Sequence, residues 1–318
     1  MSPRRQRGEQ LMVDRAEFTS YYGRPIIKAP SWSAQDIAGY FFLGGLAGAG
    51  SVLAAGAQLT GRRATATAMK LSSLTAVSLS AAALVHDLGR PARFSHMLRV
   101  VKPTSPMSVG SWLLAAYGPA AGAAALSAVT GRVPRAGAVA TGVAAALGPA
   151  LAAYTAVLAA DTAVPAWHGA HRELPYLFAA SATAAASGMA LVAAPRAENT
   201  PARWAAGIAA AGDMLAVTAA ERELGQLVAE TWRQGHGGRL LRAARVLTLA
   251  GGAGAALLAG RGRPAAVAGG LALLAGSACT RFGVFAAGIA SAQDPKYVVV
   301  PQRARRDAHD SPDGRYGT

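Results

Sequence analysis

The sequence predicts an all-α, polytopic membrane protein with about eight transmembrane helices. Two features of its composition point to this fold class: 52% of the 318 residues are hydrophobic, and only 15% are charged, against about a quarter in soluble proteins. A third feature is that the apolar residues gather in blocks of roughly twenty. A helix of that length crosses about 30 Å of hydrocarbon.

Eight apolar blocks are candidate transmembrane spans. Each should be a helix, because an open strand edge would leave unpaired amides in lipid, and a β-barrel would show alternating segments of about ten residues instead. The weakest predictions are the last two spans, which only the turn 260–264 separates. The predicted spans are residues 36–59, 66–86, 109–130, 137–160, 174–194, 203–220, 243–260 and 264–290.

Polar segments flank this transmembrane region, which covers residues 36–291. Residues 1–35 form a leader in which Tyr21, Tyr22 and Trp32 suit an interfacial aromatic belt, so we expect it to lie on the membrane surface. Residues 292–318 are charged and rich in turn formers, without an apolar period. We expect them to form a tail that is mobile or ordered only by a partner.

The connections fall into two classes, because those after the odd-numbered spans are tight and basic while the others are longer. An even number of spans then places both termini on the longer-loop side, which is the expected docking face. The density of arginine favours the tight loops as the cytoplasmic side, whereas the raw count of lysine and arginine favours the other side. We expect a multi-pass protein of the plasma membrane.

The net charge of +15 fits loops that face anionic headgroups. It does not indicate nucleic-acid binding, because aromatic and basic residues do not interleave as a binding platform requires. The single cysteine, Cys279, lies in the last apolar block. No cysteine set can therefore hold zinc or an iron–sulfur cluster in this chain, and we expect no metal and no haem in it.

Three stretches carry a resemblance to a known family. The specific one is the pair formed by the Asp-Leu-Gly-Arg-Pro segment and the Pro-Thr-Ser-Pro-Met-Ser segment that follows it, whereas the glycine run alone is not specific. The stretches are Phe42-Leu43-Gly44-Gly45-Leu46-Ala47-Gly48; His86-Asp87-Leu88-Gly89-Arg90-Pro91 with Lys102-Pro103-Thr104-Ser105-Pro106-Met107-Ser108; and Tyr154-Thr155-Ala156-Val157-Leu158 with Val164-Pro165-Ala166-Trp167. Together they resemble the NrfD/PsrC family of polysulfide-reductase-type membrane subunits, over the first half of the chain.

The resemblance implies a quinone-reactive membrane subunit built as a pair of four-helix bundles. Such a subunit exchanges electrons between a membrane quinone, menaquinone or ubiquinone, and a ferredoxin-like four-cluster iron–sulfur subunit. A molybdopterin catalytic subunit usually completes the complex, so iron–sulfur and molybdopterin cofactors are expected in the partners, together with catalysis on the terminal substrate. From the residues alone, Gly44 and Gly48 form a smooth stripe against which a neighbouring helix can pack.

Two groups of residues are candidates for the quinone chemistry. His86 and Asp87 end the second span and could exchange the proton that accompanies quinone reduction or quinol oxidation, although a helix stop with a local ion pair explains them equally well. The resemblance points to Asp36, Tyr40 and Tyr154 as quinone contacts, since phenol and carboxylic acid groups can donate to a quinone carbonyl. Interfacial anchoring is the alternative for the tyrosines.

Charged residues within spans form a further candidate site. Asp213 in the sixth span and Arg281 in the eighth should lie at similar depth, so we expect them to pair or to share a water-filled site. They would be either a structural pair or a station for proton transfer. The loop residues Trp167, His168, His171, Arg172 and Glu173 are candidate contacts for the cluster-bearing partner, with a solvated loop as the alternative.

Three other functions compete with this interpretation. A transporter is possible for eight helices with buried charges, but no repeat with matching broken helices is visible. A haem-bearing anchor would need histidines deep within helices, and the histidines here lie at helix ends or in loops. A passive membrane anchor for a redox partner remains open, because composition does not distinguish it from an electron conduit.

Overall fold

A computed structural model describes residues 25–90 and 92–310, which contain helices and no strand. The long helices are α1 Gly39–Leu59, which continues the π-helix η1 Ala34–Ala38, then α2 Arg63–Asp87, α4 Pro106–Thr130, α5 Pro134–Ala160, α7 Leu174–Ala193, α8 Thr200–Glu223, α10 Gly235–Leu257 and α11 Arg263–Gln293. The shorter elements are α3 Arg93–Met97, α6 Pro165–His168, η2 Arg196–Glu198, α9 Gly225–Arg233 and α12 Lys296–Asp310. The predicted all-α class is confirmed.

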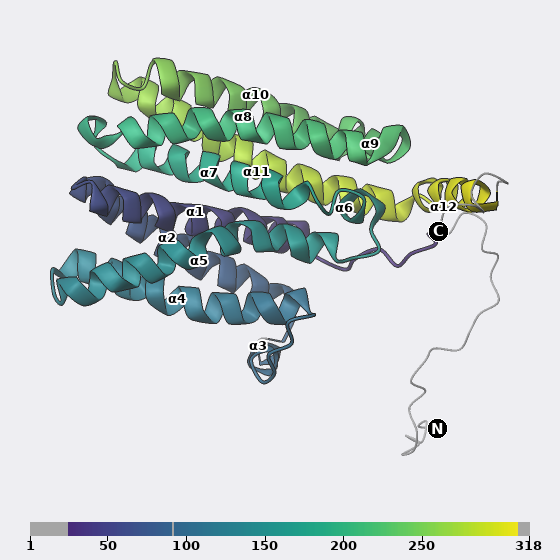
Figure 1. The fold of residues 1–318 in the computed structure, drawn as a ribbon, viewed down its shortest axis with the longest axis horizontal. Coiled ribbons are helices and arrows are strands. Elements are labelled where there is room, and N and C mark those ends of the chain that lie inside the picture. Colours follow the sequence, from purple (N-terminus) through teal and green to yellow (C-terminus); the bar gives the residue numbers. More distant parts are fainter. Residues whose placement is uncertain (1–24, 91, 311–318) are drawn as a thin grey trace, which may run out of the picture.

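The long helices form two bundles that lie side by side (Figure 1). Helices α1, α2, α4 and α5 make the first bundle, and α7, α8, α10 and α11 make the second. The two bundles meet where α1 and α5 pack against α7. Each predicted span corresponds to one of these helices, so the expected pair of four-helix bundles is present.

Seven of these helices are long and apolar enough to cross a membrane by length and composition. Helix α8 is not among them, because Arg203 and Asp213 lower the hydropathy of its apolar stretch. It nevertheless runs alongside α7 and α10 within the second bundle (Figure 1). The chain is a multi-pass membrane protein, and its sixth predicted span, residues 203–220, is a helix that is partly shielded by its neighbours.

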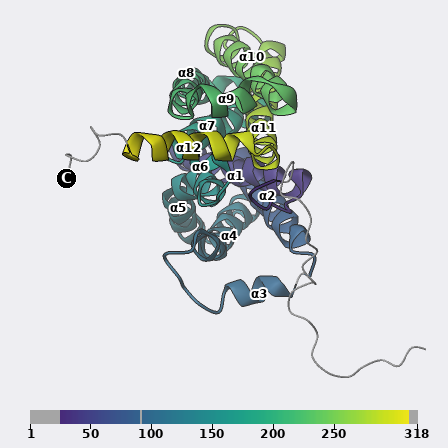
Figure 2. The same cartoon turned by 90° about the vertical axis from the view of Figure 1, so that its right-hand side faces the viewer.

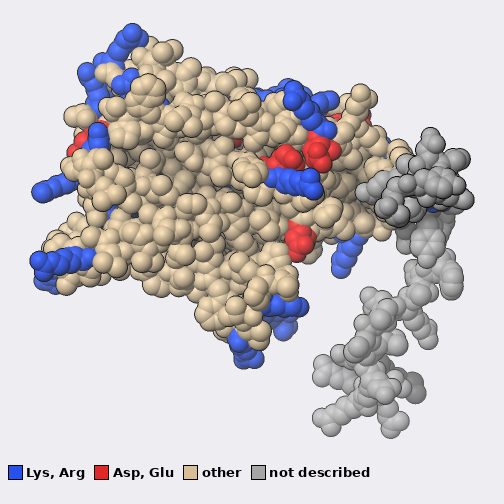
Figure 3. Space-filling model, viewed as in Figure 1, with Lys and Arg blue, Asp and Glu red and all other residues tan. Residues whose placement is uncertain are grey.

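The two ends of the molecule differ, as the loop lengths predict. The short helices α3, α6, α9 and α12 all lie at one end, which we call the long-loop face, and the tight connections lie at the opposite end, the tight-loop face (Figure 1). Lysine and arginine gather at both ends in the view of Figure 3, with an uncharged band between them. This distribution suits a protein whose middle faces lipid.

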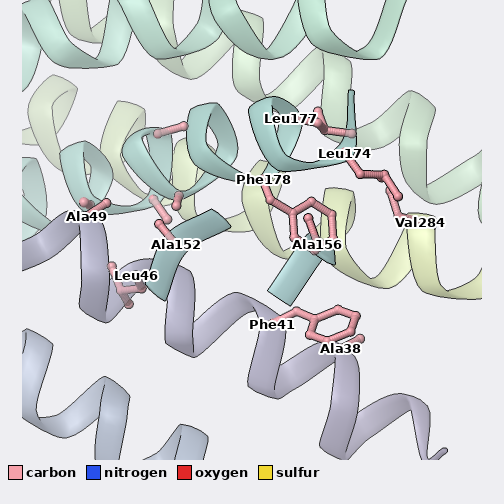
Figure 4. Close-up of a cluster of buried hydrophobic side chains, with 14 of the residues drawn as sticks. Ala38, Phe41, Leu46, Ala49, Ala152, Ala156, Leu174, Leu177, Phe178 and Val284 are labelled. Carbon is pink, nitrogen blue, oxygen red and sulfur yellow. The ribbon is translucent and has the colours of Figure 1, made fainter. Parts of the chain in front are cut away.

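Small residues allow the helices to approach closely in the core. A Cβ atom at Gly48 of α1 would lie 2.4 Å from the backbone oxygen of Gly148 in α5, so the predicted packing role of this glycine is confirmed. Larger side chains fill the junction of the bundles, where Phe41 of α1 packs against Phe178 of α7 with ring centroids 5.7 Å apart (Figure 4). The core is thus continuous across both bundles.

The C-terminal segment differs from the prediction of a tail without structure of its own. Residues 296–310 form α12, which crosses the long-loop face and extends beyond it (Figure 2). Its first turn packs against the rest of the protein, because Lys296 Nζ forms an ion pair with Glu230 Oε2 of α9 at 3.0 Å and the Tyr297 side chain is buried. The hydrogen bond from Lys296 holds the pKa of Glu230 below its usual value. Residues 1–24, including Tyr21 and Tyr22, and residues 311–318 lie outside the described part of the chain.

Candidate functional site

The first pair of candidate residues meets where η1 begins. The hydroxyl oxygen of Ser33 accepts a hydrogen bond from the backbone N–H of Asp36 at 3.4 Å, which caps this helical start. The carboxylate of Asp36 then lies 3.0 Å from Nδ1 of His86 at the end of α2. The His86 side chain is 79% exposed, so this carboxylate–imidazole pair connects directly to the long-loop face.

Asp87 holds the chain before η1 against the end of α2. Its Oδ1 accepts a hydrogen bond from the backbone N–H of Ser33 at 3.0 Å, so Asp87 bonds across to the leader. Helix α2 ends immediately afterwards at Gly89, whose φ of +65° is readily adopted only by glycine. Adjacent residues at one helix end therefore point to two different places, His86 to the surface and Asp87 to the interior.

A partly enclosed cavity of about 90 Å³ lies between η1, α1, α2, α4 and α5. It brings together Tyr40 and Tyr154, which the resemblance indicated as quinone contacts, and Asp87, which was selected separately as a proton-exchanging residue. The two phenols are close enough to interact electrostatically, and both side chains are buried. The remaining wall is mostly apolar and consists of Trp32, Ile37, Leu84, Leu88, Met97, Met107, Gly110, Ser111 and Leu158.

Tyr154 also lines a second, larger space. A groove of about 600 Å³ opens between α4 and α5, and its wall includes Val109, Leu113 and Val157. The Tyr154 ring lies directly against Gly110, where a Cβ atom would come within 2.0 Å of the phenol. Tyr154 is therefore the shared wall between an open, largely apolar groove and a smaller, partly enclosed cavity that is lined in part by polar groups.

Aromatic rings close the site at the junction of the two bundles. Trp32 stacks on Trp167 of α6 with ring centroids 5.7 Å apart, so Trp32 packs inward where the sequence suggested an interfacial belt. Trp167 is fully buried and its Nε1 donates to the backbone oxygen of Val284 at 2.8 Å. In the same loop, the rings of His168 and His171 stack on each other beside the groove.

Asp213 and Arg281 are both buried, but they do not form a direct ion pair. Neither carboxylate oxygen of Asp213 has a hydrogen-bond partner among the described residues. The Arg281 guanidinium instead donates to the backbone oxygen of Phe178 at 2.6 Å and lies 3.8 Å from the centroid of its ring. Asp213 interacts electrostatically with Arg281 and with Arg245. The arrangement leaves a shared hydrated site as the remaining form of the predicted pairing.

Sequence reasoning missed several residues of the cavity. Gly110 and Met97 reach it through the packing of α4 and α3, which no local motif encodes. Outside this cavity, sequence reasoning also missed Lys70. It could have been found, because it is a lone lysine inside the predicted second span, and the structure buries it. The described residues contain no group of three or more histidine, cysteine, aspartate or glutamate side chains that could hold a metal ion.

Comparison with known proteins supports the resemblance. A family model described as "Polysulphide reductase, NrfD" matches residues 28–205, which is more than half of the chain. The match covers the whole first bundle, α7 and the start of α8. No curated protein matches the chain. Since the match includes the cavity residues Tyr40, Asp87 and Tyr154, the chain belongs to the NrfD family of polysulphide reductase membrane proteins.

Proposed function

We propose that this chain is the quinone-reactive membrane subunit of an oxidoreductase complex in the plasma membrane. It would exchange electrons between a menaquinone or ubiquinone and a ferredoxin-like iron–sulfur subunit, with a molybdopterin subunit acting on the terminal substrate. The observation that carries the proposal is the position of Tyr154, between an apolar groove that opens at the outer surface of the first bundle and a smaller cavity that contains Tyr40 and Asp87.

The two spaces suit the two parts of a quinone. The groove of about 600 Å³ is within the usual size range of ligand sites and has an apolar wall, as an isoprenoid tail requires. The smaller cavity of about 90 Å³ cannot hold a whole head group but supplies hydroxyl and carboxylate groups. Rotation of the Tyr154 ring would join the two spaces, so that the quinone ring enters from lipid.

The polar groups of the cavity can serve both oxygens of a quinone ring. The phenols of Tyr40 and Tyr154 are hydrogen-bond donors, and Asp87 has an oxygen without a hydrogen bond to the described residues. In quinol oxidation Asp87 would accept a proton from a ring hydroxyl and release it at the long-loop face, beside the exposed His86–Asp36 pair. Quinone reduction would use the same groups in reverse.

The long-loop face is the proposed docking surface for the iron–sulfur subunit. It carries α3, α6, α9 and α12, and Trp32, which lines the cavity, stacks on Trp167 of α6. A cluster bound there would be on the same side of the membrane as the quinone head group. The loop that carries His168 and His171 is part of this proposed contact.

The second bundle has a proposed role in proton transfer. Asp213 and Arg281 are buried charged residues with unpartnered polar atoms, which is costly unless water or a proton satisfies them. Arg281 reaches the first bundle, because a Cβ atom at Gly45 of α1 would lie 3.0 Å from its guanidinium. A charge placed at this junction can respond to changes in the quinone bundle.

Replacing Tyr154 by phenylalanine tests the proposal. In the purified complex we expect Tyr154→Phe to lower the rate of quinol-dependent reduction of the partner's clusters by about tenfold or more, which corresponds to the loss of one hydrogen bond in the reacting state. Tyr176→Phe is the matched control, because Tyr176 is 74% exposed on α7. Equal rates for the two variants would contradict the proposal, and a wild-type complex without quinol-dependent electron transfer would favour a passive anchor.

A further inference from the structure

A second polar cluster lies in the first bundle, in the half nearest the tight-loop face. Lys70 of α2 is 9% exposed and donates a hydrogen bond to Gln58 Oε1 of α1. The same oxygen accepts a hydrogen bond from Thr141 Oγ1 of α5 at 3.4 Å. No carboxylate among the described residues lies within ion-pair distance of Lys70, so its ammonium group has only neutral partners there.

A small cavity of about 10 Å³ adjoins this cluster, between α1, α2, α4 and α5. Its polar wall comes from Lys70, Ser73, Ser51 and Thr141, and the rest consists of alanines. Ser73 is 1% exposed and its hydroxyl has no hydrogen-bond partner among the described residues. A buried water needs about this much space and two to four polar partners, so the cavity suits a single water that bridges Lys70 and the two serines.

The polar path continues toward the middle of the bundle. Ser51 Oγ lies 2.6 Å from the hydroxyl of Tyr117, which in turn donates to the backbone oxygen of Ala47 at 2.5 Å. From Gln58 to Ala47 the path follows α1 for about 16 Å, given a rise of about 1.5 Å per residue. Gln58 is half-buried next to the α1–α2 turn, so the path begins at the tight-loop face.

A purely structural role explains these features less well. A lysine that only tied helices together would be expected to have a carboxylate partner, because burying an unpaired ammonium costs free energy. Ser73 packs against Gly50 of α1, but this contact leaves its hydroxyl beside the cavity without a hydrogen-bond partner among the described residues. A hydrated chain of exchangeable groups accounts for all of these features together.

We propose that the Lys70 cluster is a proton path from the tight-loop face into the first bundle, so that quinone chemistry at the long-loop face moves protons across the membrane. This inference rests on the proposed quinone function. Reduction of one quinone takes up two electrons from the iron–sulfur subunit and two protons, one through Asp87 at the long-loop face and one through the Lys70 cluster, and quinol oxidation releases them by the same two routes. Lys70 passes one proton at a time to the Ser73–Ser51–Tyr117 groups and regains one from the aqueous face past Gln58.

A gap along α2 separates the Lys70 cluster from the quinone cavity. Ser73 and Ser80 lie seven residues apart on one face of this helix, a separation of about 10 Å. The Ser80 hydroxyl donates to the backbone oxygen of Tyr40 at 3.2 Å, beside the cavity. Proton transfer across the stretch between the two serines is the step that links the Lys70 cluster to the quinone.

The test measures protons taken up or released at the tight-loop side per electron transferred, using the purified complex in proteoliposomes with a pH-sensitive dye. Lys70→Met removes the proton carrier, while Lys70→Arg keeps the charge but does not release a proton. We expect both variants to lower the ratio at least twofold. Arg132→Met, which removes an exposed charge from the tight-loop side, should keep the wild-type ratio.

The inference would be overturned if the wild type moved no protons at the tight-loop side, or if Lys70→Met kept the wild-type ratio of protons to electrons. A wild-type ratio in Lys70→Arg would also overturn it, because it would show that only the charge of Lys70 is needed. If Lys70→Met does not assemble, Tyr117→Phe removes one buried hydroxyl of the path and is expected to lower the ratio as well. A wild-type complex that transfers no electrons from quinol would contradict the quinone function itself, which is a separate outcome.

Discussion

The two bundles use buried polar groups in different ways. In the first bundle these groups line spaces: Tyr40, Asp87 and Tyr154 surround one cavity, and Lys70 and Ser73 border another. In the second bundle Asp213 is buried without a hydrogen-bond partner among the described residues, and none of the cavities lined by the first-bundle groups extends to it. The second bundle also borders spaces of about 270 and 160 Å³, but neither Asp213 nor Arg281 lines them. The first bundle therefore places its buried polar groups beside space for a ligand, while the second buries these charges away from such space.

Glycine contacts bring the helices of the second bundle close together, as they do in the first. A Cβ atom at Gly188 of α7 would lie 2.5 Å from the backbone oxygen of Gly270 in α11, and one at Gly276 would lie 3.0 Å from the backbone nitrogen of Thr248 in α10. Such close backbone contacts along several helix pairs make a dense scaffold. The family match is consistent with this division, since it covers the first bundle and ends in α8, before Asp213.

The largest expected effect concerns the buried charges of the second bundle. Arg281→Leu and Asp213→Asn should each lower the free energy of unfolding, Arg281→Leu by about 3 kcal/mol, because it leaves a buried carboxylate without its nearest cation. The double variant should be more stable than the sum of the single effects predicts. Thermal unfolding of the four proteins in one detergent measures this coupling. Strict additivity would show that the two charges act independently.

A smaller but more selective effect is expected in the first bundle. Gly110→Ala places a methyl group within 2.0 Å of the Tyr154 phenol and must displace the ring. We expect quinol-dependent electron transfer to fall about tenfold or more, since misplacing a reacting group by about 1 Å can cost that much. Gly118→Ala on the same helix is the control, because nothing lies within 4 Å of its added Cβ. Equal rates of electron transfer in Gly110→Ala and Gly118→Ala would contradict the proposed role of Tyr154 in quinone binding.

The smallest effect concerns the tight-loop contact that ties the two bundles together. Glu198 of η2 accepts a hydrogen bond from the backbone N–H of Thr65 at 2.8 Å, and this bond lowers the pKa of Glu198 from its usual value of 4.5. A lowered folded-state pKa means that the stabilisation is present above pH 4.5 and is lost as the pH falls through the lower value. Glu198→Gln should therefore be less stable than the wild type at about pH 7, by less than about 1 kcal/mol.

Repeating the unfolding measurement near pH 3.5 checks this contact. The difference in stability between Glu198→Gln and the wild type should shrink there, because the wild-type carboxylate becomes protonated as well. A difference that stays constant between the two pH values would mean that the negative charge of Glu198 does not stabilise the contact between α2 and η2.

Local sequence patterns predicted the fold well because lipid imposes simple rules on helix length and composition. Each apolar block is a helix, and the loop lengths correctly separate the two faces. The tail 292–318 was the main difference, since α12 is held by Tyr297 and Lys296 through contacts with α9 that no periodicity reveals. Such contacts depend on how distant helices meet.

The candidate site was predictable in its residue types but not in its geometry. Tyr40, Asp87 and Tyr154 were found from motifs, and they meet at one cavity. The closing of that cavity by Met97 and Gly110 depends on the packing of a short helix and of α4, which sequence patterns do not contain. Of the two predicted forms of the Asp213–Arg281 site, the direct ion pair is not present and the shared hydrated site stays a prediction, because equal depth in two helices does not fix the rotation of either one.

Photolabelling distinguishes the two bundles most directly. An azido-quinone of either head-group type would be illuminated with the complex in its membrane, and the labelled peptides identified by mass spectrometry. The account predicts that the label lies on α4 and α5 around Gly110 and Tyr154, and that unlabelled quinone competes for it. Competed labelling confined to residues 200–293 of the second bundle would contradict the assignment of the quinone to the first bundle.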